Sequence, residues 1–278
     1  MLMVMAVVAA QAGTWKIHNY FVTSKIQNIY DTGDKIYYLN SNRLYLYDKA
    51  TQATTSLSRQ NLLSDATISQ IYYDSEKNLL FVAYANSNLD IIDASGNVTN
   101  IPNIKNMTVN VRNATVTSGE LQSYVSTEIK DITFNNGTAY VVYGYGYLTI
   151  DETTMRVIKN YDLGRTITAN SVCIFGDRQI LLSNRYCYYG SPINAENPTS
   201  QYTRISGDFT GHRMFPINDT SAFVLHSSTL YRYDYPVGGT PKLTKLVDAA
   251  PTSVQRTPTG FIINFAQAHK YRLGSVFL

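Results

Sequence analysis

The chain has 278 residues, of which 44% are hydrophobic, 12% aromatic and 15% charged, with 23 Tyr and a formal net charge of +3. This composition excludes an intrinsically disordered chain, which has few aromatic residues and a high net charge. Lys and Arg are scattered singly, so the sequence shows no basic stripe for nucleic acid. A polar surface of Asn, Thr, Ser and Tyr is typical of exported β proteins, and the length suits one large all-β domain.

The start of the chain predicts export. Residues 2–10 form an uninterrupted apolar run, and Ala10-Gln11-Ala12 follows as a signal-peptidase pattern. We therefore predict a signal peptide over residues 1–12 and a mature protein at the cell surface or in the periplasm. The run is shorter than the about 20 residues of a membrane span. Because the first basic residue is Lys16, the true start is expected upstream of Met1; the alternative is a buried N-terminal strand.

A repeated unit follows, with three apolar and aromatic strands joined by two turns. The strongest turn is Asn136-Gly137, since Asn-Gly between two apolar runs is typical of a tight hairpin. The six copies cover residues 29–48, 68–93, 129–151, 172–189, 213–234 and 253–273.

The spacing of the copies predicts a propeller. Four of them end in an Asp. Asp48 and Asp93 are 45 residues apart, and the 83 residues from Asp151 to Asp234 span two copies of about 41 each, as expected for four-stranded blades of roughly 40 to 50 residues. The longer interval between Asp93 and Asp151 indicates an inter-blade loop insertion near residues 105–128. Fourth strands are predicted at 54–57, 98–101, 156–161 and 242–247.

We therefore predict one all-β domain over residues 13–278, a β-propeller of six to seven four-stranded antiparallel blades. Residues 14–20 are the candidate strand for closing the ring. A pair of β-sandwiches is the alternative architecture, but sandwiches do not repeat a motif at fixed spacing. The terminal residues Asp48, Asp93, Asp151 and Asp234 are expected to cap the turns that follow them.

Only two cysteines are present, Cys173 and Cys187. If their strands flank a middle strand, the two residues lie about 10 Å apart, beyond the about 7 Å that a disulfide tolerates between Cα atoms. We predict two buried thiols.

No catalytic residue, metal site or cofactor is predicted. The four histidines, at positions 18, 212, 226 and 269, are isolated in sequence, and no hydrolase elbow, P-loop or calcium loop occurs. A glycan-cleaving propeller would need paired carboxylates with Arg and Tyr at its centre. Arg43, Arg165, Arg185 and Arg213 are candidates for such a centre.

Two aromatic clusters are the candidate binding residues, because Tyr beside Arg near strand ends suits stacking on sugar rings or anchoring of a protein partner. The alternative is packing between blades. The candidates are Tyr143, Tyr145, Arg185, Tyr186, Tyr188 and Tyr189.

The second repeat carries a family resemblance. Ile68-x-x-Ile71-x-x-Asp74, followed by a strand and by Leu89-x-x-Ile92-Asp93, resembles the two-component-regulator propeller repeat. Further segments narrow the resemblance: Gly13-x-Trp15-x-x-His18, Leu62-Leu63-Ser64-Asp65, 44–49, 86–92 and 100–104. With these segments, the chain resembles the N-terminal β-propeller of PorZ-like proteins, which are surface components of the Bacteroidetes type IX secretion system.

The resemblance is densest over residues 13–164. Family members continue into a second propeller and a sorting-type domain, so it implies either a fragment or a minimal form. It also implies a non-catalytic, surface-associated scaffold that serves a sortase or attachment complex and helps to deliver anionic lipopolysaccharide to secreted cargo.

The expected partners are proteins of that complex and lipopolysaccharide or another glycan, without nucleic acid. Two alternatives stay open. One is a periplasmic sensor domain that recognises glycans in a two-component system, and the other is a glycan-cleaving propeller enzyme.

Overall fold

The computed structural model describes residues 26–111, 114–117, 128–144, 146–163, 169–175, 178–183, 187–190, 203–204, 213–235, 242–257 and 260–265. The predicted signal peptide, the candidate closing strand 14–20 and the third strand of the sixth repeat lie outside these residues. In the described part of the chain, no helix has the length and apolar character needed to cross a membrane.

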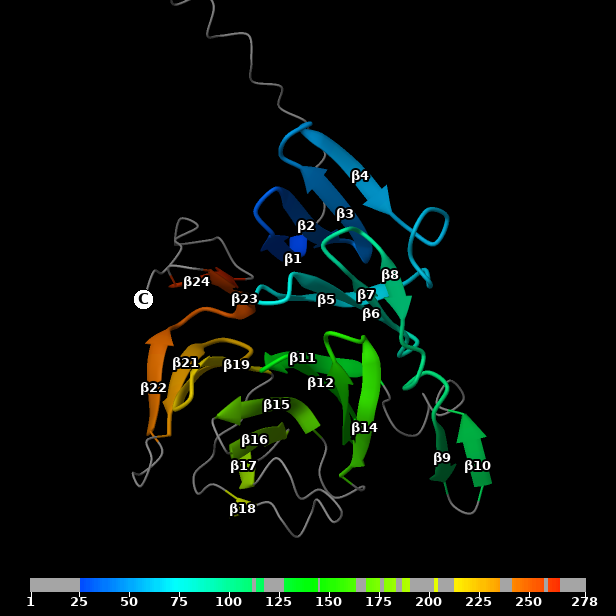
Figure 1. Cartoon of the computed structure of the whole chain (residues 1–278). Helices are drawn as coiled ribbons and strands as arrows, with labels where there is room; N and C mark the ends of the chain where they lie inside the picture. The colour runs from blue at the N-terminus through cyan, green and yellow to red at the C-terminus, as the bar shows by residue number, and fades with distance from the viewer. Residues whose placement is uncertain are drawn as a thin grey trace, which may run out of the picture.

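Six antiparallel sheets, one for each predicted repeat, are arranged around a common centre as the blades of a β-propeller (Figure 1). Five of them have four strands, and the sixth has two within the described residues. Blade 1 contains β1 (Ile26–Asp31), β2 (Lys35–Asn40), β3 (Arg43–Asp48) and β4 (Ala53–Leu57). Blade 2 contains β5 (Ile68–Asp74), β6 (Leu79–Tyr84), β7 (Leu89–Ile92) and β8 (Val98–Asn100). Blade 3 contains β11 (Ile129–Asn135), β12 (Thr138–Tyr143), β13 (Gly146–Asp151) and β14 (Arg156–Asp162).

The remaining blades follow the same order from the inside of the ring outwards. Blade 4 contains β15 (Ala169–Phe175), β16 (Arg178–Ser183), β17 (Cys187–Gly190) and β18 (Thr203–Arg204). Blade 5 contains β19 (Arg213–Asn218), β20 (Ser221–Leu225), β21 (Leu230–Asp234) and β22 (Lys242–Val247). Blade 6 contains β23 (Pro251–Thr257) and β24 (Gly260–Phe265). The predicted all-β propeller and its fourth strands are confirmed.

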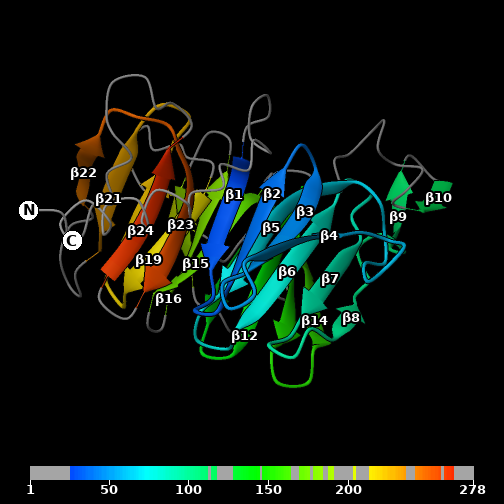
Figure 2. The ribbon, with the colours of Figure 1, turned by 90° about the horizontal axis from the view of Figure 1, so that it is seen from above.

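The segment predicted as an inter-blade loop contains a hairpin. Strands β9 (Thr108–Val111) and β10 (Ala114–Thr117) pair only with each other in the described structure. Figures 1 and 2 both place this hairpin at the periphery, beyond blades 2 and 3. The sequence predicted a loop here because the segment is rich in polar residues. The β-branched residues Thr and Val in both strands nevertheless favour a short strand pair.

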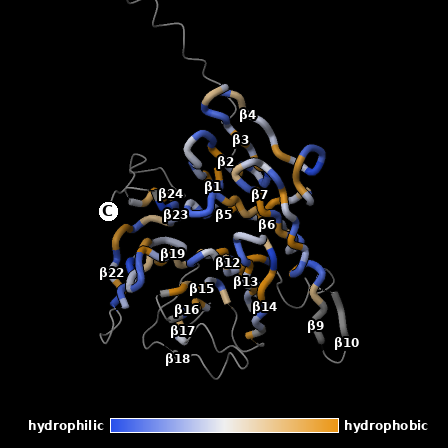
Figure 3. The backbone as a smooth tube through the Cα atoms, viewed as in Figure 1, coloured by the Kyte–Doolittle hydropathy of each residue, from blue (hydrophilic) through white to orange (hydrophobic). Residues whose placement is uncertain are grey.

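The core lies between neighbouring blades rather than at one centre. Each consecutive pair of blades from 1 to 6 shares one cluster of buried apolar and aromatic residues. Apolar colouring is accordingly strong in the inner strand β6 (Figure 3). All six side chains of β6 are buried, which explains its continuous apolar sequence. Tyr38, Tyr84 and Tyr233 are buried on the second and third strands of their blades.

The turns behave as their sequences require. Asn136 and Gly137 have φ values of 48° and 74°, the left-handed pair that a tight hairpin needs. Asp48 and Asp151 each accept hydrogen bonds from the backbone N–H and hydroxyl of the Thr three residues later, so their predicted capping role is confirmed. Asp93 likewise accepts from the N–H of Asn97. Asp234 differs, since it accepts from Ser221 on the neighbouring strand.

Cys173 on β15 and Cys187 on β17 are buried free thiols, as predicted. They flank β16, and the residue opposite Cys173 across that strand is Tyr189 rather than Cys187. Burial raises the pKa of both thiols, which keeps them protonated and unreactive.

Candidate functional site

The innermost strands of the six blades surround a central channel. In five of them a β-bulge interrupts the pairing near the start of the strand, and a polar residue follows it. Arg213 on β19 holds the equivalent place in blade 5, because its partner Leu225 matches the partner of Asp131 in the repeat. A bulge turns the next side chain away from the regular alternation. The six polar residues are Asn28, Gln70, Asp131, Ser171, Arg213 and Ser253.

Hydrogen bonds connect the inner strands in a ring. Each joins a side chain of one inner strand to the backbone of its neighbour, and together they pass through all six blades. The donors and acceptors are Tyr30 to the Ile71 carbonyl, Tyr72 to the Lys130 carbonyl, Thr133 to the Val172 carbonyl, the Met214 N–H to the Ser171 hydroxyl, Arg256 to the Pro216 and Ile217 carbonyls, and Gln255 to the Asp31 carbonyl.

Gln255 closes this ring between the last blade and the first. Its Nε2 donates to the Asp31 carbonyl at 2.6 Å, and its Oε1 accepts from the Asp31 N–H at 3.2 Å. Among the described residues, this junction has no apolar cluster of the kind that joins the other blades. The Gln255 amide therefore pairs with both backbone groups of Asp31, its N–H and its C=O, as a neighbouring strand would.

At the floor of the channel, Arg213 forms a buried ion pair with Asp131. The Nε···Oδ1 distance is 2.7 Å, and the Asp131 side chain is fully buried. The Ser171 hydroxyl and the Ile132 N–H also donate to this carboxylate. Burial disfavours the guanidinium charge, but the Asp131 carboxylate more than compensates and raises the pKa of Arg213 above its usual range. Burial raises the pKa of Asp131 as well, but the guanidinium at 2.7 Å and the donors Ser171 and Ile132 oppose this shift, so we describe the pair as ionised.

The guanidinium also lies over the Tyr72 ring, 4.7 Å from its centroid. Its Nη1 is buried and has no hydrogen-bond partner. Burial raises the pKa of Tyr30 and of Tyr72, so both phenols stay protonated and donate to the ring of hydrogen bonds.

Above this floor the channel widens into a cavity of about 360 Å³. We call it the channel pocket; it is bordered by Tyr72, Asp74, Phe134, Glu152, Arg213 and Arg256, among others from all six blades. Its mouth lies where the hairpin turns β5–β6, β11–β12 and β19–β20 meet. A concave site lined by aromatic rings with a few charged groups is the usual form of a ligand pocket.

Two carboxyl groups stand together in the wall of the channel pocket. Asp74 ends β5, and Glu152 follows β13, where its N–H donates to the Gly137 carbonyl at 3.0 Å. Glu152 is 3% exposed, and its carboxyl group shares a hydrogen bond with Asp74; no other described donor reaches its two buried oxygens. Burial, together with the neighbouring Asp74 charge, raises the pKa of Glu152 to about 8. Glu152 is therefore a neutral acid at neutral pH.

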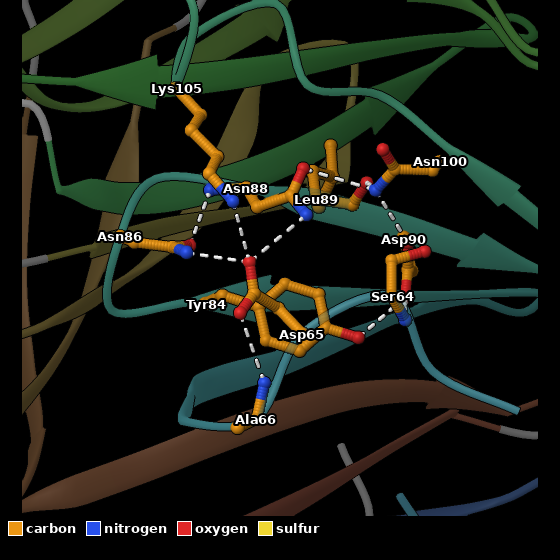
Figure 4. Close-up of polar contacts among 10 residues, drawn as sticks. All are labelled: Ser64, Asp65, Ala66, Tyr84, Asn86, Asn88, Leu89, Asp90, Asn100 and Lys105. Atoms are coloured by element: carbon orange, nitrogen blue, oxygen red, sulfur yellow. Dashed lines mark hydrogen bonds and ion pairs between the residues drawn. The ribbon is translucent and has the colours of Figure 1, made fainter. Parts of the chain in front are cut away.

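A second polar cluster lies in blade 2, among the loop before β5, the β6–β7 turn and the end of β8 (Figure 4). We call it the Asp65–Asp90 network. Asp90 is fully buried and accepts from the Ser64 N–H, the Tyr84 hydroxyl and Asn100. Asp65 accepts from Asn86, Asn88, the Ala66 N–H and Lys105.

The Asp65–Asp90 network is saturated with donors. Burial alone would raise the pKa of Asp65, but hydrogen bonds from Asn86 and Lys105 outweigh it and lower the pKa to about 2. The network ties three loops of one blade together. It also contains Ser64-Asp65 and residues 86–90, which are part of the segments that carried the family resemblance in the sequence.

The structure separates the sequence-predicted binding residues. Tyr143 is fully buried and donates to Asn160 at 2.5 Å, so it is corrected from a candidate surface contact to a packing residue. Its ring fills the space beside Gly146, where a Cβ would come within 2.8 Å of the Tyr143 oxygen. Tyr188 and Tyr189, on β17, are half-buried. Tyr145, Arg185 and Tyr186 lie outside the described residues.

Of the four arginines considered for a propeller centre, the structure places Arg213 there. Arg43 is exposed at the start of β3, away from the inner strands, and Arg165 and Arg185 are outside the described residues. Sequence reasoning did not find Asp131, Glu152 or Gln255. The signal for Asp131 was present, because five of the six first strands carry a polar residue immediately before their second apolar residue.

Among the described residues, no three His, Cys, Asp or Glu side chains gather in a way that could hold a metal ion. His226 lies beside the β20–β21 turn, with its ring 6.4 Å from that of Tyr231. The other three histidines fall outside the described residues.

Comparison with solved structures identifies similar propellers. PorZ from Porphyromonas gingivalis, described as an essential bacterial surface component of the type IX secretion system, superposes with a TM-score of 0.64 at 20% identity. The alignment covers 87% of this chain and 31% of PorZ, so the chain spans about a third of that protein's length. No curated protein matches the sequence.

Two further structures share the fold at lower identity. The WD40 β-propeller domain of Doa1 has a TM-score of 0.55 at 9% identity, with 87% of this chain and 79% of that one covered. The extracellular domain of a putative hybrid two-component system from B. thetaiotaomicron has a TM-score of 0.52 at 14% identity, covering 82% of this chain and 28% of that one.

The sequence itself matches one family, described as the type IX secretion system PorZ N-terminal β-propeller domain, over residues 36–197. This range covers more than half of the chain and includes blades 2 and 3 and most of blade 1. It contains the whole Asp65–Asp90 network. The chain therefore belongs to the family of PorZ N-terminal β-propeller domains.

Proposed function

We propose that this chain is a non-catalytic scaffold of a type IX secretion attachment complex at the cell surface, where it helps to deliver anionic lipopolysaccharide to secreted cargo. The family match over residues 36–197 carries the proposal. The description of PorZ as a surface component of this system supports the location.

The chemistry of the channel favours a non-catalytic role. A glycan-cleaving site needs two carboxyl groups about 5 to 9.5 Å apart on opposite sides of the bond that breaks. Asp74 and Glu152 instead stand close enough to share a hydrogen bond. Asp131 is committed to Arg213 at 2.7 Å. Each of these three carboxyl groups is therefore in contact with another side chain.

The tyrosines of the channel are also held in structural roles. Tyr30 and Tyr72 donate to backbone carbonyls of the next blade, and burial raises their pKa, so neither is poised to become a phenolate nucleophile. The channel does hold carboxylates, Arg and Tyr, as an enzyme of this type would. Assay of the purified chain against lipopolysaccharide and aryl glycosides is expected to detect no release of sugar, whereas turnover that Glu152→Gln abolishes would establish the enzyme instead.

A surface for the scaffold's partner is proposed at blade 4. Tyr188 and Tyr189 on β17 are half-buried. Tyr188 packs against the cluster between blades 3 and 4, and Tyr189 packs against the cluster between blades 4 and 5, with its ring 6.0 Å from that of Tyr235. Amphipathic rings near a strand end suit stacking on sugars or anchoring of a protein.

Deletion of the encoding gene in its host tests the proposed function. Secreted cargo is expected to lose its anionic lipopolysaccharide and to appear in the medium, as read by immunoblot of surface and medium fractions. Complementation with the native gene should restore attachment. Cargo that stays modified and attached in the deletion strain would overturn the proposal.

Variants locate the partner surface. Tyr188→Ala with Tyr189→Ala is expected to reduce complementation at normal protein level and fold. Tyr47→Ala, a half-buried tyrosine on β3, is the matched control and should complement fully.

A further inference from the structure

A groove of about 550 Å³ lies at the end of blade 1 that is opposite the mouth of the channel pocket. The channel pocket opens among turns between first and second strands, such as β5–β6. The groove is bordered instead by the start of β3, after the β2–β3 turn, and by residues of loop 58–67, which leads from blade 1 to blade 2. Because successive strands of a blade are antiparallel, these two kinds of turn lie at opposite ends of the blades.

Two arginines supply the charge of this groove, which we call the arginine groove after Arg43 and Arg59. Both are exposed, and among the described residues neither forms an ion pair. Arg213 and Arg232, by contrast, are each paired with a carboxylate. In the part of the groove that the structure describes, no Asp or Glu belongs to the lining. The arginine groove therefore carries positive charge without a counter-charge.

The pairing of β3 with β4 places the two arginines at the same end of one strand pair. Leu44 lies opposite Leu57 in this pair. Arg43 comes immediately before Leu44, and Arg59 comes two residues after Leu57. Adjacent strands are about 4.8 Å apart, so both side chains start from backbone positions that a short ligand can reach together.

Loop 58–67, which carries Arg59, is held in place by hydrogen bonds. The Ser58 carbonyl accepts from the backbone N–H groups of residues 61–63 at 2.9 to 3.1 Å. The second half of the loop is held by the Asp65–Asp90 network, which accepts the N–H groups of Ser64 and Ala66 (Figure 4). A ligand that pairs with Arg59 therefore has to order a side chain but no loop, which lowers the entropic cost of binding.

We propose that the arginine groove binds an acidic segment of a protein partner, with two carboxylates of that segment paired to Arg43 and Arg59. A guanidinium group matches a carboxylate with two parallel N–H···O hydrogen bonds. Leu57 and Ala66 belong to the same lining and suit an apolar residue between the two acids.

The lining favours a peptide over an anionic sugar. Sugar rings commonly stack on aromatic side chains, and none of the residues that the structure places in this lining is aromatic. The proposal goes beyond the scaffold function. Its failure would leave that function untouched, because the scaffold role is supported by the family match and is tested separately by deletion of the gene.

Fluorescence anisotropy of the full chain tests the proposal with matched probes. The acidic probe is a labelled pentapeptide in which one leucine separates two aspartates, and the neutral probe has asparagines in their place. We expect the acidic probe to bind about tenfold more tightly or better at pH 7. Its affinity should fall about threefold or more between about 50 and about 500 mM NaCl, because salt screens exposed charges.

Tetragalacturonic acid provides the sugar arm, since it carries carboxylates on a glycan. The unlabelled acidic peptide should displace the labelled one at lower concentration than this oligosaccharide does. If the oligosaccharide is the better competitor, the proposed protein source is overturned.

Two double variants complete the experiment. Arg43→Gln with Arg59→Gln should lower the affinity for the acidic probe about tenfold or more, and each single change about threefold. The thermal unfolding midpoint should stay the same, since both side chains are exposed. Arg156→Gln with Lys242→Gln removes two exposed charges from outer strands of blades 3 and 5, and should leave binding unchanged. Equal affinity for the two probes, no binding of the acidic probe at millimolar concentration, or equal losses in the two double variants would each overturn the proposal.

Discussion

The Asp65–Asp90 network and the channel pocket are built from the same kinds of side chain but differ in hydrogen bonding. In the Asp65–Asp90 network, Asp65 and Asp90 accept from neighbouring backbone, amide, hydroxyl and ammonium donors. In the channel pocket, Glu152 has only the hydrogen bond that it shares with Asp74, and the Nη1 of Arg213 is buried without a partner. A saturated cluster stabilises the fold, whereas a cluster with unmet groups beside a cavity is suited to a ligand. Hydrogen-bond saturation thus separates a structural polar cluster from a candidate site more sharply than composition does.

The largest effect is expected at the floor of the channel. Asp131→Ala leaves the Arg213 guanidinium buried beside no carboxylate, and we expect a loss of about 3 to 5 kcal/mol in the free energy of unfolding by urea at 25 °C. Asp131→Ala combined with Arg213→Met should recover most of this loss, because the uncompensated charge is gone. A single variant within 1 kcal/mol of the native chain would contradict the assignment of this pair as structural.

The Asp65–Asp90 network should show the next largest effect. Asp90→Ala removes three hydrogen bonds to a buried carboxylate and leaves the Tyr84 hydroxyl and the Ser64 N–H unpaired. We expect a loss of about 2 to 3 kcal/mol, measured in the same urea titration. A negligible loss would mean that water replaces the carboxylate, and it would remove the contrast with the channel pocket.

A smaller loss is expected for Asp65→Asn, about 1 to 2 kcal/mol at pH 7. The pKa of Asp65 is lowered to about 2 in the folded chain. Its stabilising contribution is therefore present above the unfolded pKa of about 3.8 and is lost as the pH falls towards 2. Thermal melts of both chains should converge at acidic pH; a difference that persists at pH 2 would contradict this account.

Glu152→Gln should have the opposite sign. Because the folded pKa of Glu152 is about 8 and its ordinary value is 4.5, the unfolded chain binds fewer protons between these values, and native stability falls as the pH rises through this window. The variant is expected to be more stable than the native chain by about 1 to 2 kcal/mol at pH 8 and nearly equal at pH 5. A destabilised variant at pH 8 would place Glu152 with the saturated network instead.

The fold was predictable because its signals are local. Strand, turn and spacing are encoded by short runs such as Asn136-Gly137 and the terminal Asp of four copies, so six repeats could be counted before any contact was known. The site was less accessible. Asp74 and Glu152 are 78 positions apart and belong to different blades, and each looks like an ordinary turn residue.

The Tyr143 prediction shows the same limit. A Tyr beside Gly at a strand end is compatible with exposure or burial, and its position against Gly146 decided for burial. The inner-strand polar residues were closer to being found. Aligning the first strands of the repeats would have placed Asp131 and Arg213 at equivalent positions. Their ion pair, however, joins blades 3 and 5, and it depends on how the blades are arranged around the channel.

The hydrogen bonds between Gln255 and Asp31 have a consequence for the order in which the domain folds. They join positions that are 224 residues apart, so the ring cannot close until almost the whole domain has emerged from the ribosome or the export channel. Loop closure over such a separation is entropically costly and slow compared with hairpin formation. During this interval the N–H and C=O of Asp31 stay without the Gln255 partner, which leaves the end of β1 open to pairing with a chaperone or with another copy of the chain.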